Sequence, residues 1–296
     1  MRSAGRTSLT REVRRHCAAV AASARWIEID ETALTARGGI EGLDAGLHFL
    51  DSGPDEVARY VLVLDTINFG SAWFDTLVLP DGDSGTVAIT RALTDHARRH
   101  GGTWTPAALR GLTDAEVADV LGQPAEHELM GLYAEALRQL GSWLGDSSAL
   151  DAIAAADGSA DAFAASLAAG MPFFDDVGFY KRAQITANDL VHAGVADFGD
   201  IDELTAFADN LVPHVLRTDG VLVYAPELAE RVDAGSELEP GSPMEVEIRA
   251  CAVHAVERLA HESGVPPRRL DNWLWNRGES NAYRRAPTHR TCTVFY

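Results

Sequence analysis

Along most of the chain, apolar residues return every three or four positions, which is the spacing of amphipathic helices. WIEID, at residues 26–30, is the one short segment for which we expect extended backbone, and no strand-like alternation is sustained. We therefore expect an all-α protein. The pattern predicts helices from Thr10 to about Arg25 and over 54–69, 86–100, 113–122, 126–141, 147–157, 160–169, 226–235, 242–264 and 270–278.

The segment 178–217 holds the densest mixture of charged and aromatic residues on this alanine-rich background. Its pattern predicts two helices joined by a connection that contains Gly194 and Gly199, with Asp200 or Asp202 as the cap of the second helix. We expect functional polar groups to gather here. The apolar face of the second helix would consist of Leu204, Phe207, Ala208 and Leu211.

Lys181 and Gln184 lie three residues apart and share a face of the first of these helices, whereas Arg182 lies on the neighbouring face. Asp209 comes shortly before Pro213, which either stops the second helix or opens the next one. A carboxylate is unfavourable near a helix C-terminus, but its charged form is favoured where it faces the start of the following helix. Under either alternative, Asp209 is the acid to test first.

The charge balance limits the classes of partner. With 44 acidic and 25 basic residues among 296, the formal net charge is −19, which argues against a tRNA or duplex DNA partner. A small anionic ligand needs only one or two local cations and a few backbone N–H groups. We find no run of eighteen apolar residues and no leader-like segment, and the three cysteines are scattered. We expect a cytoplasmic protein with no membrane partner.

Several common motifs are missing from the sequence. It contains no GxGxxG, GxxxxGK[ST] or GxSxG, which disfavours dinucleotide, P-loop and hydrolase-elbow chemistry. His96 and His100 lie four residues apart without an HExxH glutamate, so a solvated helix end is a better interpretation than zinc. We expect no metal and no cofactor. The aromatic segment 68–74 suits stacking on a flat ligand, although plain core is the commoner role of such residues.

Six strings, in this order, resemble the queuosine salvage protein family. They are LVLDTINF at 62–69, FYKRAQI at 179–185, LTAFAD at 204–209, VPHVLR at 212–217, EVEIRAC at 245–251 and HRTCTVFY at 289–296. The resemblance extends from about Phe49 to Tyr296. The sequence departs from the family pattern at residues 70–72, at Asn210, where we expect an aromatic residue, and at His214, where glutamine is usual. These departures concern base stacking more than the class of reaction.

The resemblance implies a nucleotide N-glycosylase that hydrolyses the N-glycosidic bond of queuosine 5′-phosphate and releases queuine, a 7-deazaguanine base of tRNA modification, for salvage. It implies a fold similar to helix-hairpin-helix DNA glycosylases. We expect one domain over residues 1–296, with a subdivision near residue 170 as the alternative organisation. The small-molecule nucleotide is then the partner, with no nucleic-acid polymer. A base-excision glycosylase, which would need a basic groove, and a non-catalytic nucleotide-binding protein are the competing hypotheses.

Breaking an N-glycosidic bond develops positive charge on the ribose, so a carboxylate is needed near C1′. We assign that role to Asp209. Lys181 would be its partner, would bind the 5′-phosphate, or would act at C1′. An acidic pocket also suits the secondary ammonium group of queuine. Further substrate-binding candidates are Asp65, Asn68, Phe69, Trp73, Tyr180 and Gln184, followed by Glu247, Arg249 and Asp271, which a buried ion-pair network would explain equally well.

Overall fold

The computed structural model describes residues 8–33, 42–280 and 282–296. Helices dominate it, which confirms the predicted helical class. The α-helices are α1 (Leu9–Ala22), α2 (Pro54–Thr66), α3 (Gly85–His100), α4 (Pro106–Arg110), α5 (Asp114–Leu121), α6 (Glu128–Leu144), α7 (Ala149–Ala154), α8 (Ala160–Gly170), α9 (Lys181–His192), α10 (Leu211–Thr218), α11 (Pro226–Asp233), α12 (Pro243–Ser263) and α13 (Pro267–Gly278). Short 3₁₀ helices are η1 (Glu31–Ala33), η2 (Ser71–Thr76), η3 (Pro172–Phe174) and η4 (Ile201–Glu203).

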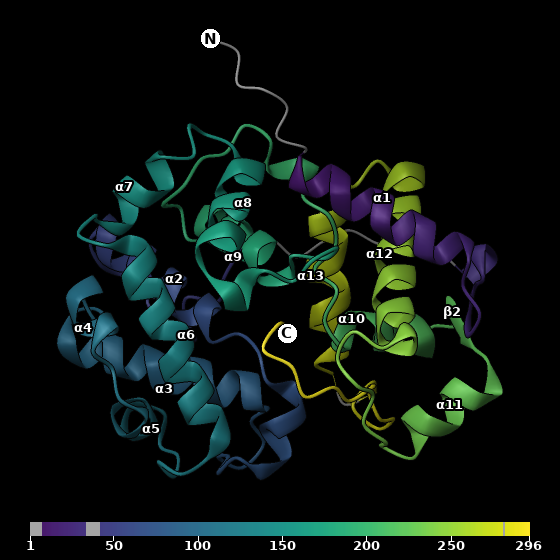
Figure 1. Cartoon of the computed structure of the whole chain (residues 1–296), viewed down its shortest axis with the longest axis horizontal. Helices are drawn as coiled ribbons and strands as arrows, with labels where there is room; N and C mark the ends of the chain where they lie inside the picture. The colour runs from purple at the N-terminus through teal and green to yellow at the C-terminus, as the bar shows by residue number, and fades with distance from the viewer. Residues whose placement is uncertain (1–7, 34–41, 281) are drawn as a thin grey trace.

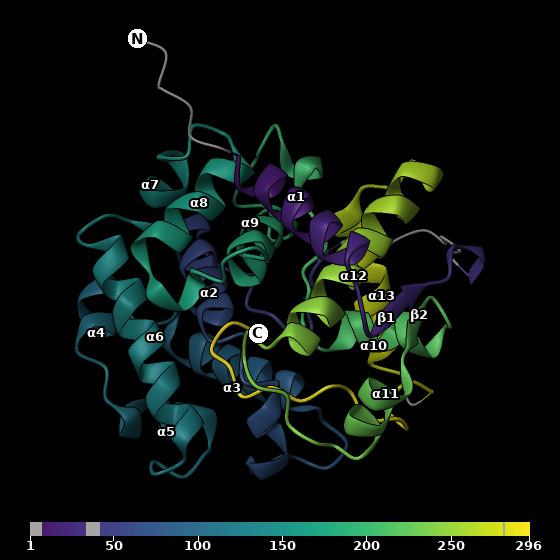
Figure 2. The same cartoon turned by 45° about the vertical axis from the view of Figure 1, so that its right-hand side comes forward.

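The helices gather in two groups that meet near the middle of the molecule. Helices α2 to α9 lie on one side, and α10 to α13 lie on the other together with α1 (Figure 1). Helix α1 packs along α12, and strand β1 (Ile27–Ile29) pairs antiparallel with β2 (Leu222–Tyr224), as Figure 2 shows. A cut near residue 170 would therefore separate α1 and β1 from the elements on which they pack.

The helix starts follow local capping chemistry. Pro54 occupies the first turn of α2, and Thr113 forms a capping box with Glu116 at the start of α5, where a helix was predicted. Helix α1 begins at Leu9, two residues earlier than a cap at Thr10 predicts, because Ser8 caps it instead. At α12, Pro243 begins the helix as expected, but Ser242 makes no side-chain capping bond. Helix α4 carries too short an apolar pattern to be predicted.

The predicted second helix of the central segment is wrong. Residues 204–210 form no helix, and α10 begins only at Leu211. Asp200, one of the two caps we expected for that helix, accepts the Ala160 N–H at the start of α8 instead, at 2.6 Å. Side chains from three other elements bind the backbone of 204–210 and replace helical hydrogen bonds. Gln184 accepts from the Thr205 N–H at 2.9 Å, Asp271 from the Phe207 N–H at 2.8 Å, and Arg249 donates to the Ala208 carbonyl at 2.9 Å.

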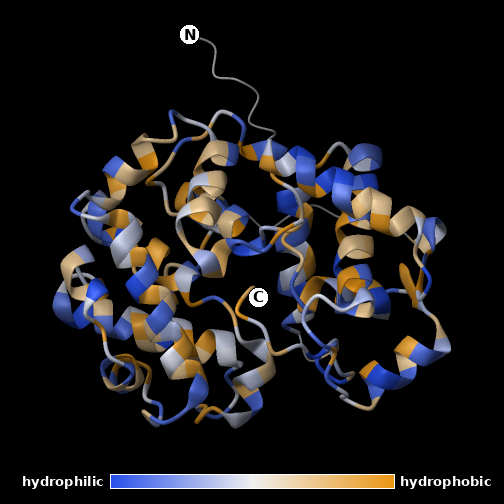
Figure 3. Ribbon diagram, in the orientation of Figure 1, coloured by the Kyte–Doolittle hydropathy of each residue, from blue (hydrophilic) through white to orange (hydrophobic). Residues whose placement is uncertain are grey.

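A continuous apolar core connects both groups of helices. Buried side chains from Val13 in α1 to Leu274 in α13 belong to one cluster, and Figure 3 shows orange and blue alternating along the outer helices, as amphipathic packing requires. The C-terminal segment docks on this body, with Tyr296 buried and its carbonyl accepting the Gly70 N–H at 3.0 Å. Within the described ranges, no helix has the length and apolarity needed to cross a membrane.

Candidate active site

A cavity of about 1040 Å³ opens where the two groups of helices meet. Its walls include the end of α2, η2, the start of α3, one face of α9, the non-helical segment before α10, helix α13 and part of the C-terminal segment. This is a volume typical of small-molecule sites. Six of the predicted residues line it: Asp65, Asn68, Phe69, Lys181, Asp209 and Asp271.

One face of α9 forms a wall of the cavity. Lys181, Ile185, Asp189 and His192 follow one another at intervals of four, four and three residues, so they share that face, and all four line the cavity. With a rise of about 1.5 Å per residue, Lys181 and Asp189 are separated by roughly 12 Å along the helix axis. Asp189 was not among the predicted residues, although its spacing of eight from Lys181 is the signal that would have found it.

Lys181 begins α9 directly after a strained residue. The preceding Tyr180 has φ 49 and ψ 41, in the left-handed region that few residues other than glycine adopt. The backbone N–H of Lys181 donates to the Asp176 carboxylate at 3.3 Å, and its Nζ lies 3.4 Å from both the carbonyl and the side-chain oxygen of Asn68. The ammonium group is thereby held inside the cavity rather than in solvent.

Carboxylates surround the Lys181 ammonium. Burial lowers its pKa, and Asp209 is the strongest of the charges that oppose this effect, ahead of Asp65 and Asp271. The lysine is only 4% exposed, so these charges interact with little solvent screening. The acids therefore favour the charged form of the lysine and oppose the effect of burial on its pKa.

Asp209 is fixed by the start of α10. Its Oδ1 accepts the backbone N–H groups of Leu211 and Val212 at 2.8 Å and 2.9 Å. This is the second of the two alternatives we considered, in which the carboxylate faces a helix N-terminus and the local field favours its charge. Within the described part of the chain, Oδ2 of Asp209 accepts no hydrogen bond, which leaves one oxygen for a ligand.

Three further acids of the cavity, Asp65, Asp189 and Asp271, have raised pKa values. Burial, followed by the charge of Asp189, raises the pKa of Asp65 well above its usual value. Burial also raises the pKa of Asp189, to about 6. Asp271 has a raised pKa because of burial and then the charge of Asp209, although the Phe207 N–H opposes the shift. Groups of this kind are concentrated at functional sites.

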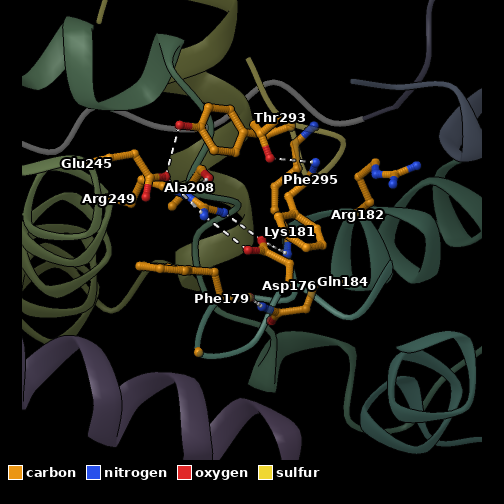
Figure 4. Close-up of polar contacts among 12 residues, drawn as sticks. Asp176, Phe179, Lys181, Arg182, Gln184, Ala208, Glu245, Arg249, Thr293 and Phe295 are labelled. Carbon is orange, nitrogen blue, oxygen red and sulfur yellow. Dashed lines mark hydrogen bonds and ion pairs between the residues drawn. The ribbon is translucent and has the colours of Figure 1, made fainter. Parts of the chain in front are cut away.

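Two buried arginines brace the walls. The Arg249 guanidinium binds Asp176 at 3.0 Å and 2.5 Å and Glu245 at 3.4 Å (Figure 4), and it lies between the rings of Phe179 and Tyr296. Arg182, on the face of α9 that points away from the cavity, donates to the carbonyls of Thr66, Phe173 and Val294. For Arg249, these contacts match the ion-pair network that was the competing interpretation of this residue.

The other predicted binding residues lie off the cavity wall, in contact with protein groups. Trp73 donates from its indole to Glu128 at 3.0 Å, and the Tyr180 hydroxyl contacts Glu12 at 3.3 Å. Gln184 is buried against Thr205. Glu247 accepts three successive backbone N–H groups, those of Arg25, Trp26 and Ile27, and so anchors the segment that leads into β1.

These features define the class of the protein: a helical, ligand-binding protein in which one helix-capped carboxylate and one buried lysine face a deep acidic cavity. The chain belongs to the Queuosine salvage protein family, whose profile matches residues 47–296. It is 37% identical over 274 aligned residues to the queuosine 5′-phosphate N-glycosylase/hydrolase of Sphaerobacter thermophilus, with 84% of each chain covered. The enzyme of the same name from Dictyostelium discoideum is 32% identical over 258 residues, covering 81% of this chain and 78% of the relative.

Proposed function

We propose that this protein hydrolyses the N-glycosidic bond of queuosine 5′-phosphate and releases queuine for salvage. The family and the names of its relatives in bacteria and eukaryotes support the reaction. The observation that carries the proposal is the arrangement around Asp209, a carboxylate fixed at a helix start with one oxygen facing a nucleotide-sized cavity beside a buried lysine.

In the proposed reaction, the oxygen of a water molecule forms a bond to C1′ of the ribose while the C1′–N9 bond breaks. The electron pair of that bond goes to the base, which is protonated as it leaves. Asp209 stabilises the positive charge that develops at C1′ and takes the proton of the attacking water. Hydrogen bonds from the α10 N–H groups keep this carboxylate oriented before the substrate arrives.

A 7-deazapurine lacks the N7 atom that is protonated when purine bases leave. Its departure therefore depends on hydrogen bonds to the other edges of the base. Asp271 has a raised pKa and lines the cavity. A carboxyl that keeps its proton near neutral pH can donate a hydrogen bond to a base on which negative charge develops. Asn68 adds an amide at the same wall.

Lys181 is proposed as the partner of Asp209 rather than as the phosphate ligand. Its ammonium lies among the carboxylates of Asp209, Asp65 and Asp271, where a phosphate dianion would be repelled. A simple hydrolase needs no covalent amine intermediate, so the lysine acts through charge: it holds the surrounding acids in place and lowers the electrostatic cost of their ionisation.

We further propose that the chain forms a single functional domain in the cytoplasm, and the continuous core supports the single domain. We also propose that it acts on the nucleotide and not on a nucleic-acid polymer, which the net charge of −19 supports. The relationship to helix-hairpin-helix DNA glycosylases stays a prediction. In support, α9 and α10 flank the candidate catalytic pair, although residues 193–210 make a longer connection than the two glycines suggested.

The test is a chromatographic assay for free base after incubation of the purified protein with queuosine 5′-phosphate, queuosine or GMP in parallel. We expect release of queuine from the 5′-phosphate. Tight nucleotide binding without release of any base would instead support a non-catalytic binding protein. Release of bases from damaged duplex DNA, with measurable duplex binding at moderate salt, would support the base-excision alternative.

A further inference from the structure

The bond-breaking step assigns no role to two acids of the cavity, Asp65 and Asp189. Asp65 lies at the end of α2 and Asp189 on the cavity face of α9, and the charge of Asp189 is one of the causes that raise the pKa of Asp65. Asp65 is 1% exposed, and its Oδ2 is buried without a hydrogen-bond partner. A buried carboxylate oxygen of a residue in a cavity wall is costly when it lacks a donor, unless a ligand supplies one.

The surroundings of this pair identify the charge of the missing group. The Lys181 ammonium and the Arg182 guanidinium both lower the pKa of Asp65, and Arg182 does so from the face of α9 that points away from the cavity. Asp189 in turn raises the pKa of Asp271. His192 lies on the same face of α9 as Asp189. Lys181 is also drawn toward Asp209 and Asp271, so one ammonium cannot neutralise all the acids present. The pair therefore favours a cationic hydrogen-bond donor and repels a phosphate.

Resting on the proposed function, we propose that Asp65 and Asp189 form the subsite for the protonated secondary amine on the side chain of queuine, and that Asp189 determines specificity for a base carrying that amine. The amine is attached through the 7-position of the base, on the side away from the ribose, and Asp189 lies roughly 12 Å along α9 from Lys181 at the reacting end. A divalent cation is the competing occupant, but the described residues offer no group of three metal-ligating side chains.

The experiment compares two ligands that differ only in the amine side chain. Asp189→Asn keeps the size and the acceptor oxygen of the residue and removes its charge. For queuosine 5′-phosphate we expect its kcat/KM to fall by about 10- to 100-fold, the range for one charge-assisted hydrogen bond. The inhibition constant of 7-deazaguanosine 5′-phosphate, which lacks the amine, should stay within about threefold of the parent value because its contacts are unchanged.

Asp197→Asn, at an exposed position after α9, is the matched control for loss of one negative charge and should leave both values unchanged. Equal losses for both ligands with Asp189→Asn would overturn the proposal, since they would indicate a general effect on the cavity. Unchanged values for both would overturn it too. Asp65→Asn provides a second variant, and thermal unfolding of each variant separates misfolding from loss of recognition.

Calorimetry with free queuine and 7-deazaguanine keeps the subsite separate from the reaction. If the parent protein releases no base but binds queuine more tightly than 7-deazaguanine, and Asp189→Asn abolishes that preference, the proposed function fails and the subsite stands. If the parent releases queuine and Asp189→Asn retains the preference, the reaction stands and the subsite fails.

Discussion

Replacing Asp209 by asparagine separates the charge of this residue from its structural role. Asparagine offers the same Oδ1 acceptor to the N–H groups of Leu211 and Val212, so the start of α10 should be preserved. The negative charge beside C1′ is lost. General-base and electrostatic contributions of this type amount to roughly 10²- to 10⁴-fold in rate, and we expect kcat for queuosine 5′-phosphate to fall by that order.

Asp209→Ala provides the structural comparison. It removes the two hydrogen bonds as well as the charge, and loss of such a cap costs about 1 kcal/mol of folding stability. In a chain of this size, that corresponds to a decrease in Tm of about 2–4 °C. Asp209→Asn should therefore keep the Tm of the parent while losing nearly as much kcat as Asp209→Ala.

The assay is steady-state release of queuine, with thermal unfolding measured on the same samples. Calorimetry should find that Asp209→Asn still binds the substrate, because the remaining walls of the cavity are intact. Turnover of Asp209→Asn at the parent rate would refute the catalytic assignment. If kcat and Tm decreased in proportion to each other in both variants, the claim that the charge of Asp209 determines kcat and its capping hydrogen bonds determine Tm would be refuted.

Three further outcomes follow from the packing and charges. The raised pKa of Asp189 means that the folded state holds the proton of this residue more tightly than the unfolded state does, so its contribution to stability is lost as pH rises from about 4 to about 6. The Tm of Asp189→Asn should therefore exceed that of the parent by more at pH 7.5 than at pH 5. Asp197→Asn is the control. Arg249→Met leaves the carboxylates of Asp176 and Glu245 buried without their partner, so urea unfolding should find a loss of about 3–5 kcal/mol, and an undiminished unfolding free energy would contradict the bracing role. Trp73→Phe should keep KM within about twofold because the indole binds Glu128 outside the cavity, whereas a large rise in KM would restore the stacking role suggested by the sequence.

Local chemistry in the sequence predicted the parts of the fold that depend on neighbouring residues. Proline at the start of α2 and the Thr113–Glu116 capping box gave correct helix starts because the donors and acceptors involved lie within one turn. WIEID was correctly expected to be extended, although its partner, strand β2, lies almost two hundred residues away. Short-range patterns carry this information directly.

The segment 204–210 could not be predicted in the same way. Its apolar residues return at helical spacing because they enter a core from several directions, and the backbone hydrogen bonds come from Gln184, Asp271 and Arg249 in other elements. The same reason limited prediction of the site. Asp209 was found because a proline follows it closely in the sequence. The spacing from Lys181 places Asp189 on the same helix face, but the sequence alone does not show that this face lines a cavity.

The stripe of Lys181, Ile185, Asp189 and His192 has a consequence for how this cavity can change during evolution or engineering. Each residue inserted into or deleted from α9 between Lys181 and Asp189 would turn one end of the stripe by about 100° and shift it by about 1.5 Å relative to the other. The number of residues between Lys181 and Asp189 in α9 therefore fixes the position of one end of the cavity relative to the other. New ligand preferences are accessible by substitution on this face, while a change in the length of α9 would remove one end from the cavity altogether.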